Sequence, residues 1–374
     1  MNIRKWMCLC LSLFIMLSLS GYGFADNNDI TGEALMKELK IGWNLGNTFD
    51  APNGETSWGN PVTTKELLVK VKEVGFNTIR IPISWGKHVS AAPEYIIDAA
   101  FMDRVTTVVN DALDCGLYVI INSHHDDQIY MPTPQNREQG KAYLHAIWTQ
   151  IGEQFRTADH HLIFQTMNEP RLVGTPFEWN LNMKNEDCIA AMEIINELNQ
   201  TALDAIRATG ENNADRFVII SPYAAKPQAV TSTAFRLPED SAEGKLIVSI
   251  HAYTPYDLCL NVNSPENQFK INNLTEIKSF MKSVNYRYVQ KGIPVIIDEM
   301  GCVNKNNPEA RYAWAKAYVS AAAEYGMPCV WWDNGQLNGS GENFGLIDRR
   351  NLSVYEASSS VLQGLMDGLI PANN

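Results

Sequence analysis

The sequence predicts a (β/α)8 barrel, or TIM barrel, of the α/β class, formed by a single domain. Eight short runs rich in apolar and β-branched residues alternate with amphipathic helical patterns. Several runs are almost continuously hydrophobic, as in Val119-Ile120-Ile121 and Val295-Ile296-Ile297, which is typical of parallel strands buried on both faces. A doubly wound open sheet is the alternative, but it favours a glycine-rich turn whose spacing is missing from 42–46.

The expected strands are Ile41–Leu45, Thr78–Ile83, Tyr118–Asn122, Leu162–Thr166, Phe217–Ser221, Leu246–His251, Pro294–Asp298 and Pro328–Trp332. The expected helices are Lys65–Val74, Asp98–Cys115, Gly140–Phe155, Glu186–Ala208, Thr275–Gln290, Pro308–Tyr325 and Val354–Leu369, with a short one within Lys226–Phe235. Thr64 is a suitable N-cap for the first of these helices. Five helices end just before a glycine, as helix C-termini often do.

Residues 1–25 have the pattern of a secretory signal peptide. Arg4 and Lys5 precede an apolar stretch, Trp6 to Leu19, and Gly23-Phe24-Ala25 offers small residues for cleavage before Asp26. An uncleaved anchor is the alternative. The pattern predicts a mature chain of residues 26–374 that is secreted, either outside the cell or into a periplasm.

Charge and cysteine content exclude several classes of protein. The 374 residues carry a net charge of −12 and no basic run, so nucleic acid and anionic membranes are poor partners. Beyond the leader, five scattered cysteines with no CxxC pattern indicate neither a disulfide scaffold nor a zinc ribbon. We expect no metal, no cofactor and no membrane contact after leader removal, and a monomeric chain.

Polar residues gather near the ends of the expected strands, where barrels of this kind carry their chemistry. Those singled out are Asn44, Arg80, His124, His125, Asn168, Glu169, His251, Tyr253, Glu299 and Trp332. Each has a plain structural interpretation too, since buried histidines and tandem tryptophans usually belong to a core. Their joint placement favours a functional site.

Glu169 and Glu299 suit glycoside hydrolysis with two carboxylates. Pro170 pushes the residue before it toward extended geometry, so Glu169 is expected at the last extended position of the fourth strand. The fourth and seventh strands lie nearly opposite each other in an eight-stranded barrel, so the two carboxylates can face each other across its mouth. One would protonate the leaving oxygen while the other attacks the anomeric carbon.

The neighbours of these carboxylates predict different protonation states. Arg80 can stabilise an ionised Glu299 and Tyr253 can hold it by a hydrogen bond, so Glu169 is expected to keep its proton. Asn168 can bind a sugar hydroxyl, and Trp332 offers a flat floor for a sugar ring. A separation of about 5–5.5 Å between the carboxyl groups would indicate a retaining mechanism.

Taken together, Arg80, His124-His125, Asn168-Glu169-Pro170, His251-x-Tyr253, Glu299 and Trp332 resemble the pattern of glycoside hydrolase family 5. The segments 42–48 and 58–61 resemble its bacterial endoglucanase branch, subfamily 4, and the resemblance covers Lys40 to Leu369. It implies that Glu169 is the general acid/base and Glu299 the nucleophile of a retaining endo-β-1,4-glucanase, and that the other residues line the subsite of the reacting sugar.

The same resemblance implies a neutral β-1,4-linked substrate. Cellulose-like glucan, mixed-linkage glucan and xyloglucan all remain open, as do a xyloglucan-specific enzyme and an endo-xylanase or mannanase of the same fold. Trp58 and Trp179 lie in polar loops, where an exposed tryptophan is costly unless it is used, so we expect them at outlying sugar subsites.

Two other classes of function are alternatives. A metal-dependent barrel hydrolase could use His124, His125, Asp126, Asp127 and His251, but the first strand lacks the His-x-His pair that such enzymes often carry. A non-catalytic carbohydrate-binding barrel would not need both carboxylates together with the arginine and the tyrosine.

Overall fold

The computed structural model describes residues 30–339 and 341–370, and the expected signal peptide lies outside them. Eight parallel strands close into a barrel in sequential order, with the first strand paired to the eighth. The strands are β1 (Ile41–Leu45), β2 (Thr78–Ile81), β3 (Tyr118–Asn122), β4 (Leu162–Gln165), β5 (Val218–Ile220), β6 (Leu246–His251), β7 (Val295–Met300) and β8 (Cys329–Asp333). The predicted barrel is confirmed, and the open sheet is excluded.

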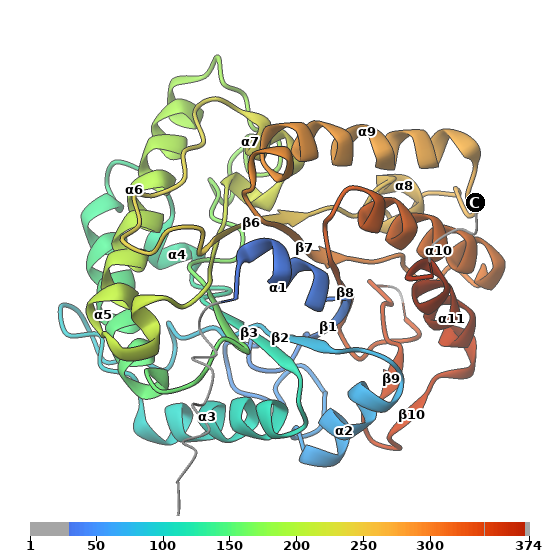
Figure 1. The fold of residues 1–374 in the computed structure, drawn as a ribbon, viewed down its shortest axis with the longest axis horizontal. Helices are drawn as coiled ribbons and strands as arrows, with labels where there is room; N and C mark the ends of the chain where they lie inside the picture. Colours follow the sequence, from blue (N-terminus) through green and yellow to red (C-terminus); the bar gives the residue numbers. More distant parts are fainter. Residues whose placement is uncertain (1–29, 340, 371–374) are drawn as a thin grey trace, which may run out of the picture.

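Helices surround the barrel, as Figure 1 shows. The long ones are α2 (Lys65–Glu73), α3 (Ala99–Asp114), α5 (Arg137–Phe155), α6 (Glu186–Ala208), α9 (Ile271–Arg287), α10 (Pro308–Glu324) and α11 (Ser359–Gly368). Shorter helical segments are α4 (Asp127–Tyr130), η1 (Glu211–Ala214), η2 (Tyr223–Ala225), α7 (Pro227–Thr231), α8 (Tyr256–Cys259), η3 (Val289–Lys291) and η4 (Glu356–Ser358), and β9 (Ile347–Asp348) pairs with β10 (Ser353–Val354). Within the described residues, no helix is long and apolar enough to cross a membrane.

Local signals explain most helix ends. The Thr64 side chain accepts a hydrogen bond from the Leu67 amide and caps α2, as predicted. The five glycines expected to stop helices all have positive φ, which a residue without Cβ adopts at little cost: Gly75, Gly116, Gly210, Gly292 and Gly326. Helix α9 begins at Ile271, four residues earlier than predicted, because the Asn273 side chain accepts a hydrogen bond from the Lys270 amide at 2.6 Å and satisfies a donor at the helix start.

The barrel interior is divided into an apolar and a polar layer. The apolar layer is closed by α1 (Gly32–Glu38), a helix that the sequence did not predict and that lies over the barrel in Figure 1. Leu35 and Leu39 pack there against Tyr118, Ile120, Ile163, Phe217, Ile219, Ile247, Ile296 and Val330. Two residues further along the strands stand Asn122, Gln165, Ser221, Ser249, Asp298 and Trp332. Because strand side chains alternate between faces, these residues point to the same interior and carry its polar layer toward the C-terminal ends.

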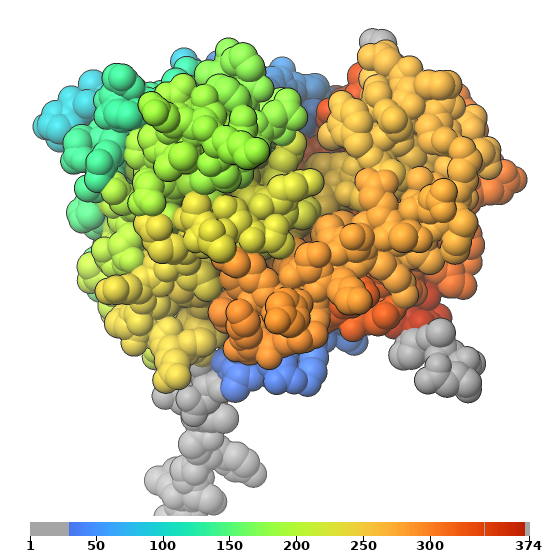
Figure 2. Space-filling view, turned by 90° about the horizontal axis from the view of Figure 1, so that it is seen from above, coloured from blue at the N-terminus to red at the C-terminus, as the bar shows by residue number. Residues whose placement is uncertain are grey.

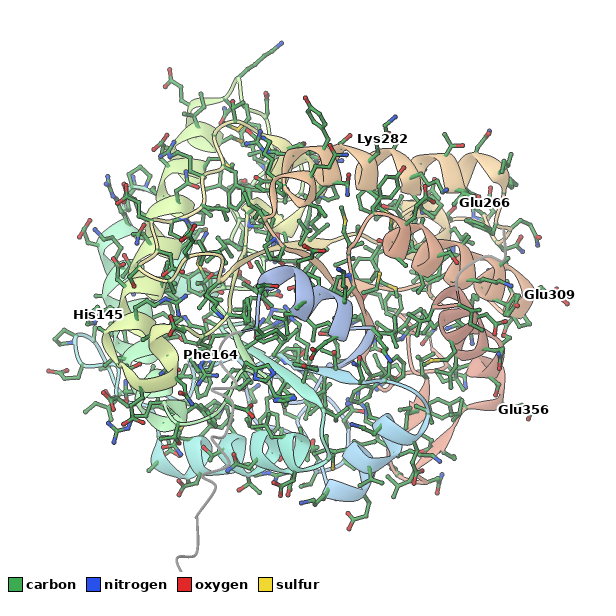
Figure 3. All side chains as sticks on the ribbon, in the orientation of Figure 1. His145, Phe164, Glu266, Lys282, Glu309 and Glu356 are labelled. Carbon is green, nitrogen blue, oxygen red and sulfur yellow. The ribbon has the colours of Figure 1, made fainter. Side chains whose placement is uncertain are left out.

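The outer surface carries the ordinary charged residues. Figure 3 labels Phe164 at the wall of the barrel, where it is fully buried, and Lys282, Glu309 and Glu356 at the periphery, where they are exposed. The space-filling view in Figure 2 shows a notch at the upper edge between green segments and orange segments, on the side opposite α1. The loops that follow the strands therefore frame an opening at that end.

Candidate active site

Arg80 of β2 is the centre of the polar layer and is completely buried. Its Nη1 donates to Asn44 Oδ1 at 2.9 Å and to Glu299 Oε1 at 2.7 Å. Its Nη2 donates to Asn168 Oδ1 at 2.7 Å, and its Nε donates to Gln165 Oε1 at 2.8 Å. A planar guanidinium offers donors in a rigid fork, so one buried side chain orients four groups from three strands or strand ends at once.

Gln165 and Asp298 complete this layer. Gln165 Nε2 donates to Asp298 Oδ2 at 2.6 Å, and the Ser249 hydroxyl donates to the other carboxylate oxygen at 2.7 Å. Burial opposes ionisation of Asp298, but His251 and Arg80 lower its pKa below the usual value. Gln165 was missed by the sequence reasoning. The signal was a polar residue at the end of the apolar run Leu162–Phe164, two positions after the inward-facing Ile163.

Asn44 differs from the expectation that it binds substrate. The side chain is fully buried, and its amide nitrogen donates to the carbonyl oxygens of Asp298 and Trp331 while its oxygen accepts from Arg80. All its polar atoms are thus used inside the barrel. Asn44 lies opposite Arg80 in the strand register, which places it beneath the opening as a support for the guanidinium.

Glu299 is held on both carboxylate oxygens. Arg80 contacts Oε1, and the Tyr253 hydroxyl donates to Oε2 at 3.0 Å. Burial and the Glu299 charge raise the pKa of Tyr253 well above its usual value, so the hydroxyl keeps the proton that it donates. Strand β7 runs on to Met300, two residues past the predicted end, so Glu299 lies within the strand.

Glu169 lies beyond its strand, contrary to the expectation that it is the last extended residue. β4 ends at Gln165, and the last ladder bond in this stretch runs from the Thr166 amide to the Ile219 carbonyl. The chain then leaves the sheet, and Glu169 Oε1 lies 2.7 Å from Nδ1 of His251. One ligand oxygen of Glu169, one of Glu299 and a ring nitrogen of His251 all lie within 4.8 Å of one another. The two carboxylates therefore meet at the mouth, as predicted.

The protonation pattern differs from the prediction. Burial alone would lower the pKa of His251, but Glu299, Asp298 and Glu169 raise it to about 10. Burial disfavours the charged form of Glu169, yet the hydrogen bond from His251 brings its pKa below the usual value. Burial raises the pKa of Glu299, with Glu169 adding to the effect, while His251 and Arg80 oppose it. These pKa directions oppose the expectation that Glu169 holds the proton, because the neighbouring imidazole favours the Glu169 carboxylate.

His124, His125 and Trp332 line the opening beside these groups. The ring of His124 is parallel to that of Trp332, with 5.8 Å between centroids. Burial lowers the pKa of His124 well below its usual value and lowers that of His125 to about 4, so both are neutral near pH 7. A Cβ on Gly46 would lie 2.9 Å from the Trp332 ring, so only a glycine lets the indole lie against the backbone there.

The two loop tryptophans are exposed, as expected. Trp58 is 41% exposed and lies 5.8 Å from the ring of His125, which connects it to the central group. Trp179 is 45% exposed and lies in the loop after β4, with the Arg171 guanidinium carbon 4.3 Å from its ring centroid.

The residues of the metal-dependent alternative have other partners. The Asp126 carboxylate accepts hydrogen bonds from the Ser123 hydroxyl and from the amides of Trp85 and Gly86. Asp127 contacts Arg171, and His251 contacts Glu169. Three of the five proposed ligands, Asp126, Asp127 and His251, therefore already have partners within the protein, whereas His124 and His125 lie within 4.8 Å of a carboxylate oxygen of Asp50.

Comparison with known families and proteins agrees with this geometry. Residues 44–338 match the family model described as cellulase (glycosyl hydrolase family 5). A cellulase/esterase of Acetivibrio thermocellus is 42% identical over 91% of this chain, but the chain spans only 41% of that relative's length. An endoglucanase B of Neocallimastix patriciarum is 41% identical over 96% of the chain and 76% of the relative.

Solved structures give the same result. A family 5 lichenase from Caldicellulosiruptor sp. F32, in complex with cellotetraose, superposes with a TM-score of 0.88 at 40% identity, covering 91% of this chain and 96% of the other. A GH5-4 broad specificity endoglucanase from Ruminococcus champanellensis, with bound cellotriose, superposes with a TM-score of 0.85 at 42% identity, covering 90% and 99%.

Proposed function

The chain belongs to glycosyl hydrolase family 5, and on that premise we propose that it is a secreted, retaining endo-β-1,4-glucanase that cleaves soluble or amorphous β-glucans. The observation that carries the proposal is that one carboxylate oxygen of Glu169 and one of Glu299 lie within 4.8 Å of each other at the mouth of the barrel. Inverting enzymes need room for a water between the carboxyl groups, with a separation of roughly 6.5–9.5 Å, so the shorter distance supports retention.

Glu299 is the proposed nucleophile. Arg80 and Tyr253 hold its two oxygens, which fixes the carboxylate against the anomeric carbon and limits its freedom to rotate. Attack forms a covalent glycosyl-enzyme and releases the leaving-group oxygen. Arg80 also fixes the amide oxygen of Asn168, which turns the NH2 group away from the guanidinium as a donor for a sugar hydroxyl.

Glu169 is the proposed general acid and base. The proton on His251 can pass to Glu169 across their 2.7 Å contact when a substrate oxygen replaces water beside the carboxylate. Glu169 then protonates the leaving oxygen, and its carboxylate later takes a proton from the water that hydrolyses the intermediate. The His251 imidazole thus supplies the proton that Glu169 donates as general acid.

The remaining site residues fit a polysaccharide. Trp332 with His124 forms the floor of the central subsite, and exposed Trp58 and Trp179 provide stacking faces further out. Neutral histidines in the lining suit an uncharged glycan. Cello-oligosaccharides are bound in the structures of two relatives, which supports a glucan backbone.

Substrate assays test this proposal directly. We expect reducing ends and mixed short oligosaccharides from carboxymethylcellulose, lichenan and xyloglucan, and initial products of β configuration by NMR. Release of α products would contradict retention. Predominant activity on xyloglucan alone, or on xylan or glucomannan, would favour the corresponding specific enzyme. Glycan binding with no rise in reducing ends would favour a binding protein.

The proposed signal peptide and mature start belong to the same picture. Cleavage after Ala25 would release residues 26–374 as the catalytic domain. N-terminal sequencing of the protein recovered from culture medium should begin at Asp26, and light scattering should give the mass of a monomer. Retention of the full-length chain in the cell membrane would contradict cleavage.

A further inference from the structure

We propose that Arg171 is a positioning residue that links the exposed Trp179 to the carboxylate of Glu169 and adjusts the affinity of that carboxylate for its proton. The proposal rests on the function proposed above. Arg171 follows Pro170 directly, and its guanidinium extends along the loop that carries Trp179.

The contacts of Arg171 join the loop to Glu169. Its Nη1 donates to the Glu169 carbonyl oxygen at 2.9 Å and lies 4.0 Å from the carboxylate oxygen Oε2 of the same residue. Its guanidinium carbon lies 4.3 Å from the centroid of the Trp179 ring. The Arg171 guanidinium therefore binds the backbone carbonyl of Glu169, lies near the Glu169 carboxylate and packs on the face of the Trp179 ring.

Two acidic residues orient this cation. Asp127 Oδ1 lies 3.3 Å from Nη1, and Glu178 Oε1 accepts from Nε at 3.3 Å. The second Glu178 oxygen accepts from the Gly174 amide, so the same residue also fixes the turn of the loop. The Arg171 side chain is only 11% exposed. An ordinary surface arginine would have neither this burial nor a tryptophan on its face.

The charges of Arg171 and Asp127 act on Glu169 in opposite directions. A positive charge at this range favours the carboxylate, whereas the Asp127 carboxylate disfavours it. Burial raises the pKa of Asp127 to about 7. As the pH falls through this value, Asp127 takes up a proton and its carboxylate no longer offsets the charge of Arg171. The other charged or titratable groups that face Glu169 within the described residues are His251 of β6, Tyr253 after β6, Glu299 of β7, His125 after β3, Lys226 after η2 and Glu342 after β8.

The test compares substitutions of opposite sign. In Arg171→Met, loss of the cation should move the alkaline limb of the kcat/KM profile upward by about one pH unit. In Asp127→Asn, loss of the opposing carboxylate should move the limb downward. Arg171→Lys restores the charge, so it should return the alkaline limb toward its original position. It does not restore the planar stack on Trp179, so the KM for long glucans should stay raised.

Matched variants separate this role from a structural one. Trp179→Ala should raise the KM for long glucans and leave the limb in place. Arg207→Met removes an arginine whose side chain is 9% exposed and paired with Asp240, remote from Glu169 in its contacts, and should change stability alone. Equal loss of stability in the Met and Lys variants of Arg171, with an unmoved limb, would overturn the proposal.

A readout without turnover keeps the two proposals distinguishable. In uniformly 15N-histidine-labelled protein, the titration of His251, assigned by its disappearance in His251→Gln, reports the proton that the imidazole shares with Glu169. We expect this titration to move upward in Arg171→Met and downward in Asp127→Asn. These shifts in a parent protein that cleaves no glucan would reject the proposed function and retain the inference. If the parent protein cleaves glucan but the His251 titration is the same in both variants as in the parent, the inference is rejected and the proposed function is retained.

Discussion

Arg80 donates a 2.7 Å hydrogen bond from Nη1 to Oε1 of Glu299 while its own side chain is entirely shielded from solvent. Removing a cation from water is costly unless the site supplies charge and hydrogen bonds in return. Arg80 finds both, because Glu299 and Asp298 lie near it and three side-chain amides accept its other donors. Stability and the orientation of the proposed nucleophile thus depend on the same residue.

Substitution of Arg80 should therefore cost both stability and activity. Arg80→Met leaves two buried carboxylates without the arginine charge and its hydrogen bonds, and we expect a loss of about 3–5 kcal/mol in the free energy of unfolding, measured with urea. Arg80→Lys keeps the charge but cannot make the forked contacts, so it should lose less stability and still fall by about 100-fold in kcat/KM. Wild-type activity in the lysine variant would contradict the orienting role.

The roles of Glu169 and Glu299 can be separated chemically. Alanine at either position should abolish most activity on barley β-glucan, since it removes either the proton donor or the attacking oxygen. With an aryl cellobioside of good leaving group, added azide should rescue Glu299→Ala to an α-glycosyl azide and Glu169→Ala to a β-glycosyl azide. Exchange of the two products between the variants would reverse the assignment.

Much of the barrel could be predicted because each strand carries its own local signal. β1, β3 and β6 have the predicted bounds, and a glycine with positive φ follows each of five helices. The helix α1 was not predicted, because a seven-residue helix with one buried leucine, Leu35, and a second at its C-cap, Leu39, has too few turns to show a period. Its place at the end of the barrel depends on contacts with residues far along the chain.

The sequence predicted most of the residues that line the site, but it did not predict the pKa shifts among them. The polar residues after the strands do converge at one end, because parallel strands end on the same side. The burial of Asn44 depends on strand register, which alternation alone did not reveal. The effect of His251 on the pKa of Glu169 depends on a 2.7 Å contact between residues 82 positions apart. No property of the local sequence specifies such a distance.

Because of His251, the free energy of unfolding should decrease as the pH rises into the alkaline range. Its pKa is about 10 in the folded protein and about 6.5 when the chain unfolds, so its stabilising charge is fully present below about pH 6.5 and is lost as pH rises through 10. The free energy of unfolding should fall across that window, and His251→Gln should remove this part of the decline. His145→Gln, an exposed change on α5, is the control and should keep it. An identical decline in both variants would exclude His251 as the source.

Trp58 should contribute to the binding of long substrates. Its 41% exposed ring beside His125 offers a stacking face, and Trp58→Ala should raise the KM for long glucans about tenfold, equivalent to about 1.4 kcal/mol. Activity on aryl cellobiosides should change much less. Tyr286→Ala removes a more exposed aromatic ring, 71% accessible, from the outer helix α9 and should leave both values unchanged. Equal effects of the two substitutions would mean that Trp58 has no specific role.

Gly46 offers a steric test of the subsite floor. An added Cβ would lie 2.9 Å from ring atoms of Trp332 and 2.9 Å from the Asp333 carbonyl, to which the Gly46 amide also donates at 3.0 Å. The neighbours are an indole and a backbone oxygen, neither of which can move aside cheaply, so Gly46→Ala should displace the Trp332 ring. We expect kcat/KM to fall between about 10-fold and 100-fold.

The matching control for Gly46→Ala is Gly341→Ala, because a Cβ at Gly341 would meet nothing within 4 Å. It should retain parent activity. Thermal unfolding measured beside the kinetics distinguishes displacement of the ring from general loss of structure, since an active-site effect lowers kcat/KM at temperatures where the variant is fully folded. If Gly46→Ala keeps parent kinetics, the floor can shift without consequence, and the position of Trp332 does not govern turnover.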